Sequence, residues 1–206
     1  MFSLNYEMTL ILQGQGKSLT EINGDIFNEK EIVPIWKEVK NATTLFNYYV
    51  NKLTLSYLFG SLIEAYNFAR EAEPHAGGCF GMMFVPEHNL FDSLSCLGFL
   101  GDTELSEADN SKYREQVSKN QERMKVWAEN CPANYGHKYY IVEAELARLA
   151  GNTNNALEFY DKAIELAKEH EYHLEEAIAN ELAAKFWLAR KKELFANVHL
   201  IEAHYA

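Results

Sequence analysis

The sequence predicts an all-α protein whose helices pair into hairpins that stack on one another. The main observation is a spaced set of turn-forming and small residues that returns along the chain. Three sets share this spacing, and they are Gly60, Ala65, Ala69 and Ala72; Gly151, Ala156, Tyr160 and Ala163; and Lys191, Ala196, Leu200 and Ala203. A second observation is that nearly every long stretch between turn-forming residues has helical periodicity. This pattern is typical of tetratricopeptide-type repeats, which stack into right-handed superhelices and bind partners.

Each position of the repeat has a physical reason. Gly151 is expected to end a helix in the left-handed backbone conformation, which is accessible to a residue without a β-carbon. Asn152 then supplies a side-chain oxygen that caps the next helix. Ala156 and Ala163 let that helix approach its neighbour closely, while Tyr160 fills the space between them. The 40-residue spacing exceeds the usual period of roughly 34 residues, and an ordinary antiparallel helix pair remains the alternative interpretation.

We expect a single helical-repeat domain over residues 1–206 with about ten helices. Its hairpins are predicted at residues 43–73, 86–130, 138–170 and 174–206. Residues Ile32–Trp36 are predicted to open a helix, with Pro34 tolerated in its first turn. The glycine-rich segment 76–81 is predicted to be a loop, and its glycines are a candidate hinge in the stack. These are Gly77, Gly78 and Gly81.

One long helix is predicted from an apolar stripe that ends before Pro132. Its members are Tyr113, Val117, Met124 and Trp127, whose steps of four, seven and three residues place them on one helical face. The helix is expected to run to about Asn130, because proline cannot continue it.

Composition and charge exclude several classes of protein. The formal net charge of −11 argues against binding to nucleic acid or to an anionic membrane surface. The cysteines Cys79, Cys96 and Cys131 are isolated and odd in number, which indicates neither a disulfide framework nor a zinc site. No targeting signal and no membrane-spanning run is apparent. We therefore expect a cytoplasmic protein.

Two segments invite an enzymatic interpretation, and both are weak. Residues Gly14–Ser18 resemble the end of a phosphate-binding loop. Such a loop needs a glycine five residues before Gly16, and that position is occupied by Ile11. His170 and His173 lie three residues apart near glutamates, a spacing compatible with metal ligands, yet this junction between hairpins is where polar residues usually face solvent. We expect no catalytic, cofactor-binding or metal-binding residue, and no enzymatic activity in this chain.

Four segments resemble a known family of very large, cyanobacterial-type signalling proteins. They are Val50–Gly60, Trp127–Tyr140, Val142–Glu145 and Leu174–Phe186. In that family a serine/threonine protein kinase domain precedes an AAA-type ATPase, a helical-repeat region, a GAF sensor domain and a histidine kinase. The resemblance is to the helical-repeat region and covers the chain from about Gly16 onward. It departs at Lys191 and Lys192, where glycine is usual, which leaves the tightness of the last turn open. It implies a connector between ATPase and sensor, and it carries no catalytic residue onto this chain.

Candidate partner-binding residues follow from the expected superhelix. The first helix of each hairpin would line its concave face, so the non-core positions of these helices are the candidates. They are Asn47, Val50, Tyr57, Lys138, Glu145, Arg148, Glu181 and Lys185. Lys138, Arg148 and Lys185 would meet an acidic peptide, and Tyr57 would anchor an apolar side chain. The alternative is a solvated face of mixed charge.

The expected function is that of a non-catalytic interaction and relay module in a multi-domain signalling kinase. ATP-driven rearrangement of the neighbouring ATPase would pass along the stack through small shifts between hairpins. The partners would be proteins or peptides, including neighbouring domains of the same chain. The alternative is a free-standing adaptor or oligomerisation scaffold. The C-terminal run Leu200–Ala206 is strongly helical without a capping residue, and residues 5–10 are similarly unprepared and resemble the tail of a preceding element. We therefore expect a piece excised from a longer protein, or a short protein that dimerises through its bare ends.

Overall fold

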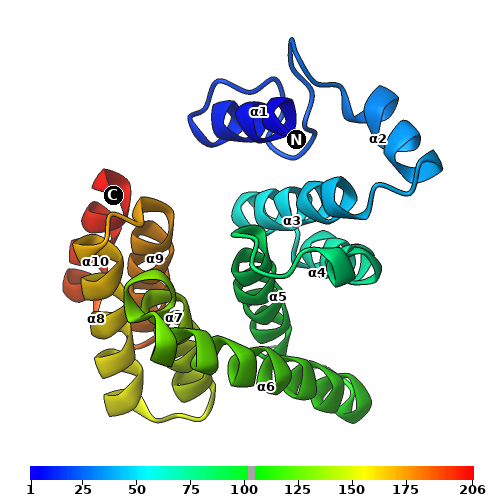
Figure 1. The fold of residues 1–206 in the computed structure, drawn as a ribbon. Coiled ribbons are helices and arrows are strands. Elements are labelled where there is room, and N and C mark those ends of the chain that lie inside the picture. Colours follow the sequence, from blue (N-terminus) through cyan, green and yellow to red (C-terminus); the bar gives the residue numbers. More distant parts are fainter. Residues whose placement is uncertain (102–104) are drawn as a thin grey trace. The chain divides into compact units, whose positions relative to one another are not determined.

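The computed structural model describes residues 1–101 and 105–206 and is all-helical over these residues, as the sequence predicts (Figure 1). The chain forms two compact units, Met1–Phe99 and Leu100–Ala206. No helix in the described part of the chain combines the length and the apolar character needed to cross a membrane.

The first unit contains five α-helices and one short 3-10 helix. They are α1 (Phe2–Leu12), α2 (Glu29–Glu38), α3 (Ala42–Phe59), α4 (Leu62–Ala72), η1 (Glu73–Gly78) and α5 (Phe84–Leu100). Helices α3 and α4 pack against each other where the sequence predicts a hairpin. The segment 76–81 is not entirely a loop, because η1 includes Gly77 and Gly78.

Helix α3 is the centre of the first unit. Most of its side chains are buried, since α1, α2, α4 and η1 all contact it. Leu4 and Ile11 of α1 and Val33 of α2 belong to the same apolar cluster as Leu45 and Phe46 of α3. The N-terminal segment therefore covers α3 and gives it an environment that is apolar on several sides.

The described residues of the second unit form five helices in chain order. They are α6 (Glu107–Asn130), α7 (Pro132–Leu149), α8 (Thr153–Glu169), α9 (His173–Ala189) and α10 (Glu193–Tyr205). Helices α7 and α8 form one hairpin and α9 and α10 a second one, and α8 packs against α9. The rings of Tyr160 on α8 and Phe186 on α9 meet edge to face, with 5.7 Å between their centroids.

The turns inside the hairpins explain the repeated residues. Gly60, Gly151 and Lys191 all have left-handed backbones, with φ of +119°, +73° and +57°. Lys191 therefore makes the same kind of tight turn as the glycines, in spite of its β-carbon. The alanines that follow at the repeat offset of five residues are fully buried in all three hairpins, at Ala65, Ala156 and Ala196.

Candidate functional site

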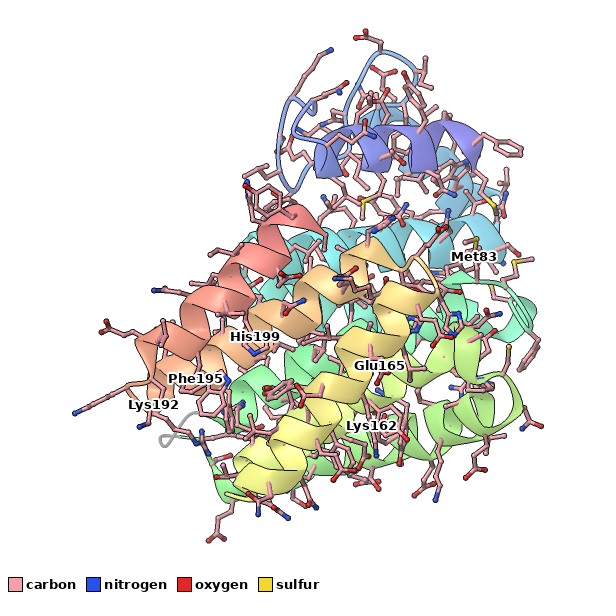
Figure 2. The ribbon with its side chains drawn as sticks, turned by 90° about the vertical axis from the view of Figure 1, so that its left-hand side faces the viewer. Met83, Lys162, Glu165, Lys192, Phe195 and His199 are labelled. Carbon is pink, nitrogen blue, oxygen red and sulfur yellow. The ribbon has the colours of Figure 1, made fainter. Side chains whose placement is uncertain are left out.

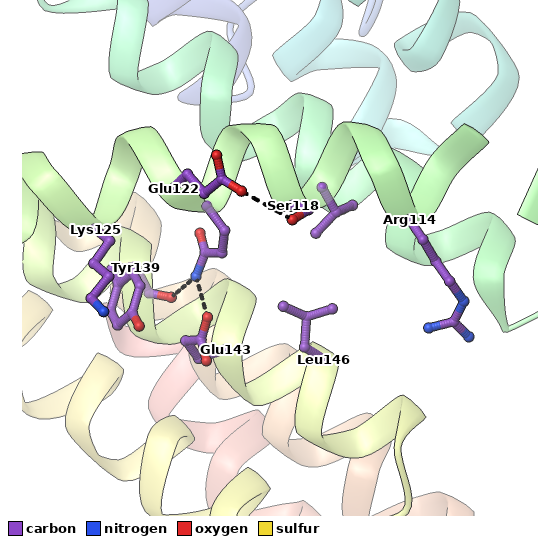
Figure 3. Close-up of a pocket in the computed structure, with 9 residues that line it drawn as sticks. Arg114, Ser118, Glu122, Lys125, Tyr139, Glu143 and Leu146 are labelled. Atoms are coloured by element: carbon purple, nitrogen blue, oxygen red, sulfur yellow. Dashed lines mark hydrogen bonds between the residues drawn. The ribbon is translucent and has the colours of Figure 1, made fainter. Parts of the chain in front are cut away.

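The candidate site is a groove between α6 and α7 in the second unit, shown in Figure 3. It has a volume of about 340 Å³. We call it the α6–α7 groove, and it is lined by Arg114, Val117, Ser118, Gln121, Glu122, Lys125, Tyr139, Glu143 and Leu146.

Local sequence features place the two helices that form the groove. The Ser106 hydroxyl accepts a hydrogen bond from the Asp109 amide at 3.1 Å and caps α6. Pro132 stands in the first turn of α7, where its missing N–H needs no partner, and it separates the two helices sharply. The predicted stripe on α6 is confirmed as an inward face, since Val117 and Met124 are buried.

Gln121 connects the two walls of the groove. Its side-chain amide donates one hydrogen bond to the Tyr139 backbone oxygen at 3.0 Å and another to Glu143 Oε1 at 2.8 Å (Figure 3). The side chain is buried, and its Oε1 atom accepts no hydrogen bond from the described residues. Both donors of the amide thus fix α6 against α7, which keeps the groove in one shape.

The groove combines an apolar floor with charged ends. Leu146 and Tyr139 provide partly exposed apolar surface, and the buried Val117 lies beneath it. Arg114 and Lys125 stand toward opposite ends of the groove in Figure 3. Burial, followed by the nearby Glu143 carboxylate, raises the pKa of the Tyr139 hydroxyl. Glu122 and Glu143 line the groove as well, so charged groups of both signs surround its apolar floor. Such a surface suits a ligand that carries an apolar side chain with charged groups beside it.

A second hollow of about 330 Å³ shares Lys125 and Tyr139 with the groove. It continues along α7 toward Gly136 and reaches Leu166 of α8. A β-carbon at Gly136 would lie 2.9 Å from Leu166 Cδ1, so a larger residue there would displace the end of the Leu166 side chain. The two hollows offer adjoining sites for a partner longer than one side chain.

In the first unit, the structure contradicts the expected accessibility of two candidate residues. Asn47 and Val50 are buried, and Asn47 donates a hydrogen bond to Asn5 Oδ1 at 2.8 Å. The reason is that α1 contacts the helix face that was expected to line an open surface. Tyr57 is half-buried, and its ring meets that of Phe91 with 5.5 Å between the centroids.

In the second unit, Lys138 and Glu145 are also buried, so their expected exposure is wrong. Lys138 forms an ion pair with Glu175 of α9. Glu145 accepts hydrogen bonds from Arg148 and from the Tyr160 hydroxyl. These side chains lie between the helices of the unit and stabilise their packing.

The remaining candidates are accessible to a greater extent. Arg148 is half-exposed and is paired with Glu145 at 2.7 Å. Glu181 and Lys185 are exposed and form an ion pair with each other at 2.6 Å on α9. The three cations on which the expected acidic partner depended, Lys138, Arg148 and Lys185, are thus all engaged within the chain, and none lines the α6–α7 groove.

The groove residues themselves were missed by sequence reasoning, although one signal was present. Gln121 lies four residues after Val117 and three before Met124, so it is a polar residue on the apolar stripe of α6. A polar side chain at such a position needs a hydrogen-bonding partner on the facing helix. The partner here is α7, which forms the opposite wall.

The second unit also contains a buried imidazole. His137 has no exposed surface, and neither of its ring nitrogens has a hydrogen-bond partner among the described residues. Its ring stacks on Tyr172 with 4.2 Å between the centroids. Burial, together with the neighbouring Lys138 charge, lowers the pKa of His137 to about 3, so the ring is neutral at physiological pH.

No group of three or more His, Cys, Asp or Glu side chains is arranged to hold a metal ion in residues 1–101 and 105–206. Cys79, Cys96 and Cys131 are free thiols. Comparisons of the chain with protein-family models, with curated proteins and with solved structures found no match in any of the three sets.

Proposed function

We propose that this chain is a non-catalytic module that binds a segment of another protein domain in the α6–α7 groove. The observation that carries this proposal is the groove itself, because it joins an apolar floor to Arg114 and Lys125 toward its two ends. Glu122 and Glu143 also line it, but they accept hydrogen bonds from Ser118 and Gln121. Lys125 is suited to an acidic partner, since its nearest carboxylate, Glu129, lies 3.9 Å away and leaves the cation loosely paired. The ligand is a peptide segment in which an apolar side chain is flanked by carboxylates.

The scaffold for this surface is a tetratricopeptide-like stack with a right-handed superhelical path. The left-handed turns at Gly60, Gly151 and Lys191 support it, as do the buried alanines that follow them. The resemblance of Trp127–Tyr140 to the helical region of multi-domain kinases supports a place between an ATPase and a sensor domain. In that setting the module is cytoplasmic and relays rearrangements of the ATPase, with Gly81 and its neighbouring glycines as a hinge.

The second candidate function is that of a free-standing adaptor or oligomerisation scaffold. The observation that favours it is the exposed apolar side of α10, where Leu194 and Tyr205 are 76% and 81% exposed. Apolar rows of this kind mark interaction surfaces on soluble proteins.

A binding measurement tests the proposed function directly. The ATPase, sensor and histidine kinase domains of a protein from the resembled family are immobilised separately, and the 206-residue chain is titrated over each. We expect one domain to bind, and Lys125→Glu to weaken that binding by about tenfold or more because it reverses a cation at the groove.

The matched control is Lys119→Glu. Lys119 and Lys125 both lie on α6, are about equally exposed, and face a carboxylate four residues away, but Lys119 lies outside the groove. Lys119→Glu is therefore expected to leave the affinity almost unchanged. Absence of binding to every domain, or equal losses in the two variants, would contradict the proposal.

A further inference from the structure

Helix α10 carries a continuous apolar row on the side that faces away from α9. We call it the α10 outer stripe, and it consists of Leu194, Val198, Ile201 and Tyr205, which are 76%, 55%, 56% and 81% exposed. The steps of four, three and four residues place all four side chains along one line of the helix.

The inward side of α10 is already occupied by other residues. Ala196 is fully buried, His199 Nδ1 lies 2.9 Å from Asn180 Oδ1 of α9, and Phe195 stacks on Trp187. Phe195 and His199 are labelled on this helix in Figure 2. The outer stripe is therefore not needed to attach α10 to the second unit.

The preceding hairpin shows what the same positions carry when they face water. Forty residues earlier, on α8, the four equivalent positions are all polar and exposed, and they are Asn154, Glu158, Asp161 and Glu165. The equivalence is structural as well as sequential, because Gly151 and Lys191 make the same left-handed turn before the two helices. The packing of the hairpin therefore does not require apolar side chains at these positions. The apolar side chains on α10 need an explanation outside the hairpin.

We propose that the α10 outer stripe binds a second copy of this chain, with the two α10 helices antiparallel about a two-fold axis. The stripe reads the same in both directions, since its spacing is four, three and four. An antiparallel pairing then places Leu194 opposite Tyr205 of the second copy, and Val198 opposite Ile201 of the second copy. This self-complementarity is what a two-fold interface requires of a single surface.

Charge and polarity agree with this occupant. The stripe contains no charged residue, so its pairing buries no unpaired charge. Antiparallel helices also oppose their macrodipoles favourably. An anionic membrane is a poor alternative, because the chain carries a net charge of −11 and α10 contains Glu193 and Glu202.

The size of the stripe sets the expected strength of association. From Leu194 to Tyr205 it extends about 17 Å along the helix. Stable dimers bury about 800 Å² per partner, which is more than one short helix face offers. We therefore expect a reversible dimer with a dissociation constant on the order of 1–100 μM, rather than an obligate one.

The test is the mass of the full chain in solution, measured by sedimentation over a concentration series across that range. Wild-type protein is expected to shift from monomer to dimer. The double variant Val198→Glu with Ile201→Asp installs the residues of α8 and is expected to be monomeric throughout, with unchanged helicity. A wild-type chain that is monomeric at all concentrations, or a double variant that still dimerises, would overturn the proposal.

Ile63→Asp on α4 is the matched control, because Ile63 and Ile201 are both 56% exposed. It is expected to leave dimerisation unchanged, whereas Ile201→Asp alone weakens it by about tenfold or more. Equal weakening of dimerisation by Ile63→Asp and Ile201→Asp would indicate non-specific association through exposed apolar side chains, and it would overturn the assignment to α10.

Disulfide trapping tests the antiparallel register. A mixture of Leu194→Cys and Tyr205→Cys chains is expected to cross-link into heterodimers, while neither variant cross-links with itself beyond the wild-type background. Efficient cross-linking of Leu194→Cys alone would indicate a parallel pair and overturn the register. The proposal does not depend on the α6–α7 groove: Lys125→Glu is expected to change domain binding without changing the mass, so the two proposals fail independently.

Discussion

At the scale of single residues, burial decides which charges are free to act. Lys138 and Lys185 are both lysines on the first helix of a hairpin, and both are paired with glutamates. Lys138 lies between helices at 2% exposure, whereas the Lys185 side chain is 62% exposed. The Lys138–Glu175 pair therefore belongs to the core of this unit, and the Lys185–Glu181 pair belongs to its surface.

We predict very different costs for removing these two lysines. Lys138→Ala leaves the Glu175 carboxylate buried without its cation and is expected to lower the free energy of unfolding by about 3–5 kcal/mol. Lys185→Ala breaks an exposed pair and is expected to cost less than about 1 kcal/mol. Urea titration followed by circular dichroism measures both.

The double variant Lys138→Met with Glu175→Leu separates two contributions to the loss of stability. One is the loss of the ion pair itself, and the other is the buried Glu175 carboxylate that is left without a cation. It is expected to recover most of the stability, since two apolar side chains of similar volume replace the buried ions. A Lys138→Ala chain as stable as Lys185→Ala would show that Lys138 is not buried as described.

At the scale of helices, the hairpin turns keep their geometry while their residues change. The turn before α8 uses Gly151 and the turn before α10 uses Lys191, yet both backbones are left-handed. A residue with a β-carbon is strained in this conformation. The turn at Lys191 is closed by backbone hydrogen bonds, from the Lys191 amide to the Leu188 oxygen at 2.9 Å and from the Lys192 amide to the Trp187 oxygen at 3.0 Å. These bonds offset the strain of a conformation that the Lys191 side chain disfavours.

Substitutions at the two turn residues, Lys191 and Gly151, are predicted to change the free energy of unfolding in opposite directions. Lys191→Gly is expected to raise the free energy of unfolding by about 0.5–1 kcal/mol, because it relieves the left-handed strain. Gly151→Ala is expected to lower it by about 1 kcal/mol, and backbone strain is the only cause, since a β-carbon there meets no atom within 4 Å.

Thermal and urea unfolding of the two variants check this prediction, with Lys192→Gly as the control. Lys192 has φ of −107°, so glycine relieves no strain there and no gain is expected. A stabilisation by Lys192→Gly equal to that by Lys191→Gly would argue against the turn geometry.

For the whole molecule, net charge opposes self-association, whereas exposed apolar surface favours it. The chain carries a net charge of −11, so two copies repel each other in solution. The α10 outer stripe provides an attraction that does not depend on charge. Self-association through this stripe is therefore governed by how well salt screens the net charges.

We predict that added salt strengthens the dimer. Raising the ionic strength from about 0.01 M to about 0.15 M shortens the screening length from about 30 Å to about 8 Å and is expected to lower the dissociation constant several-fold. Sedimentation at the two salt concentrations measures the change. Weaker association at the higher ionic strength would indicate an interface held by ion pairs instead of the apolar stripe.

Much of the helical organisation could be predicted because it depends on local chemistry. Pro132 separates α6 from α7, and the asparagine at position 152 caps α8 by accepting a hydrogen bond from the Asn155 amide at 3.3 Å. These effects act within one helical turn and are visible in the sequence. Helix α1 was not predicted, because its residues are mostly apolar without a clear period and it is held by contacts with α3.

Most of the helices and the hairpin turns could be read from the sequence, because capping, helical periodicity and backbone freedom act over a few residues. Which polar side chains are accessible depends on the tertiary structure. Asn47 is buried because Asn5 reaches it from 42 residues away, and Lys138 because Glu175 faces it from 37 residues away. Burial depends on which distant segments pack together, and that is a property of the folded chain.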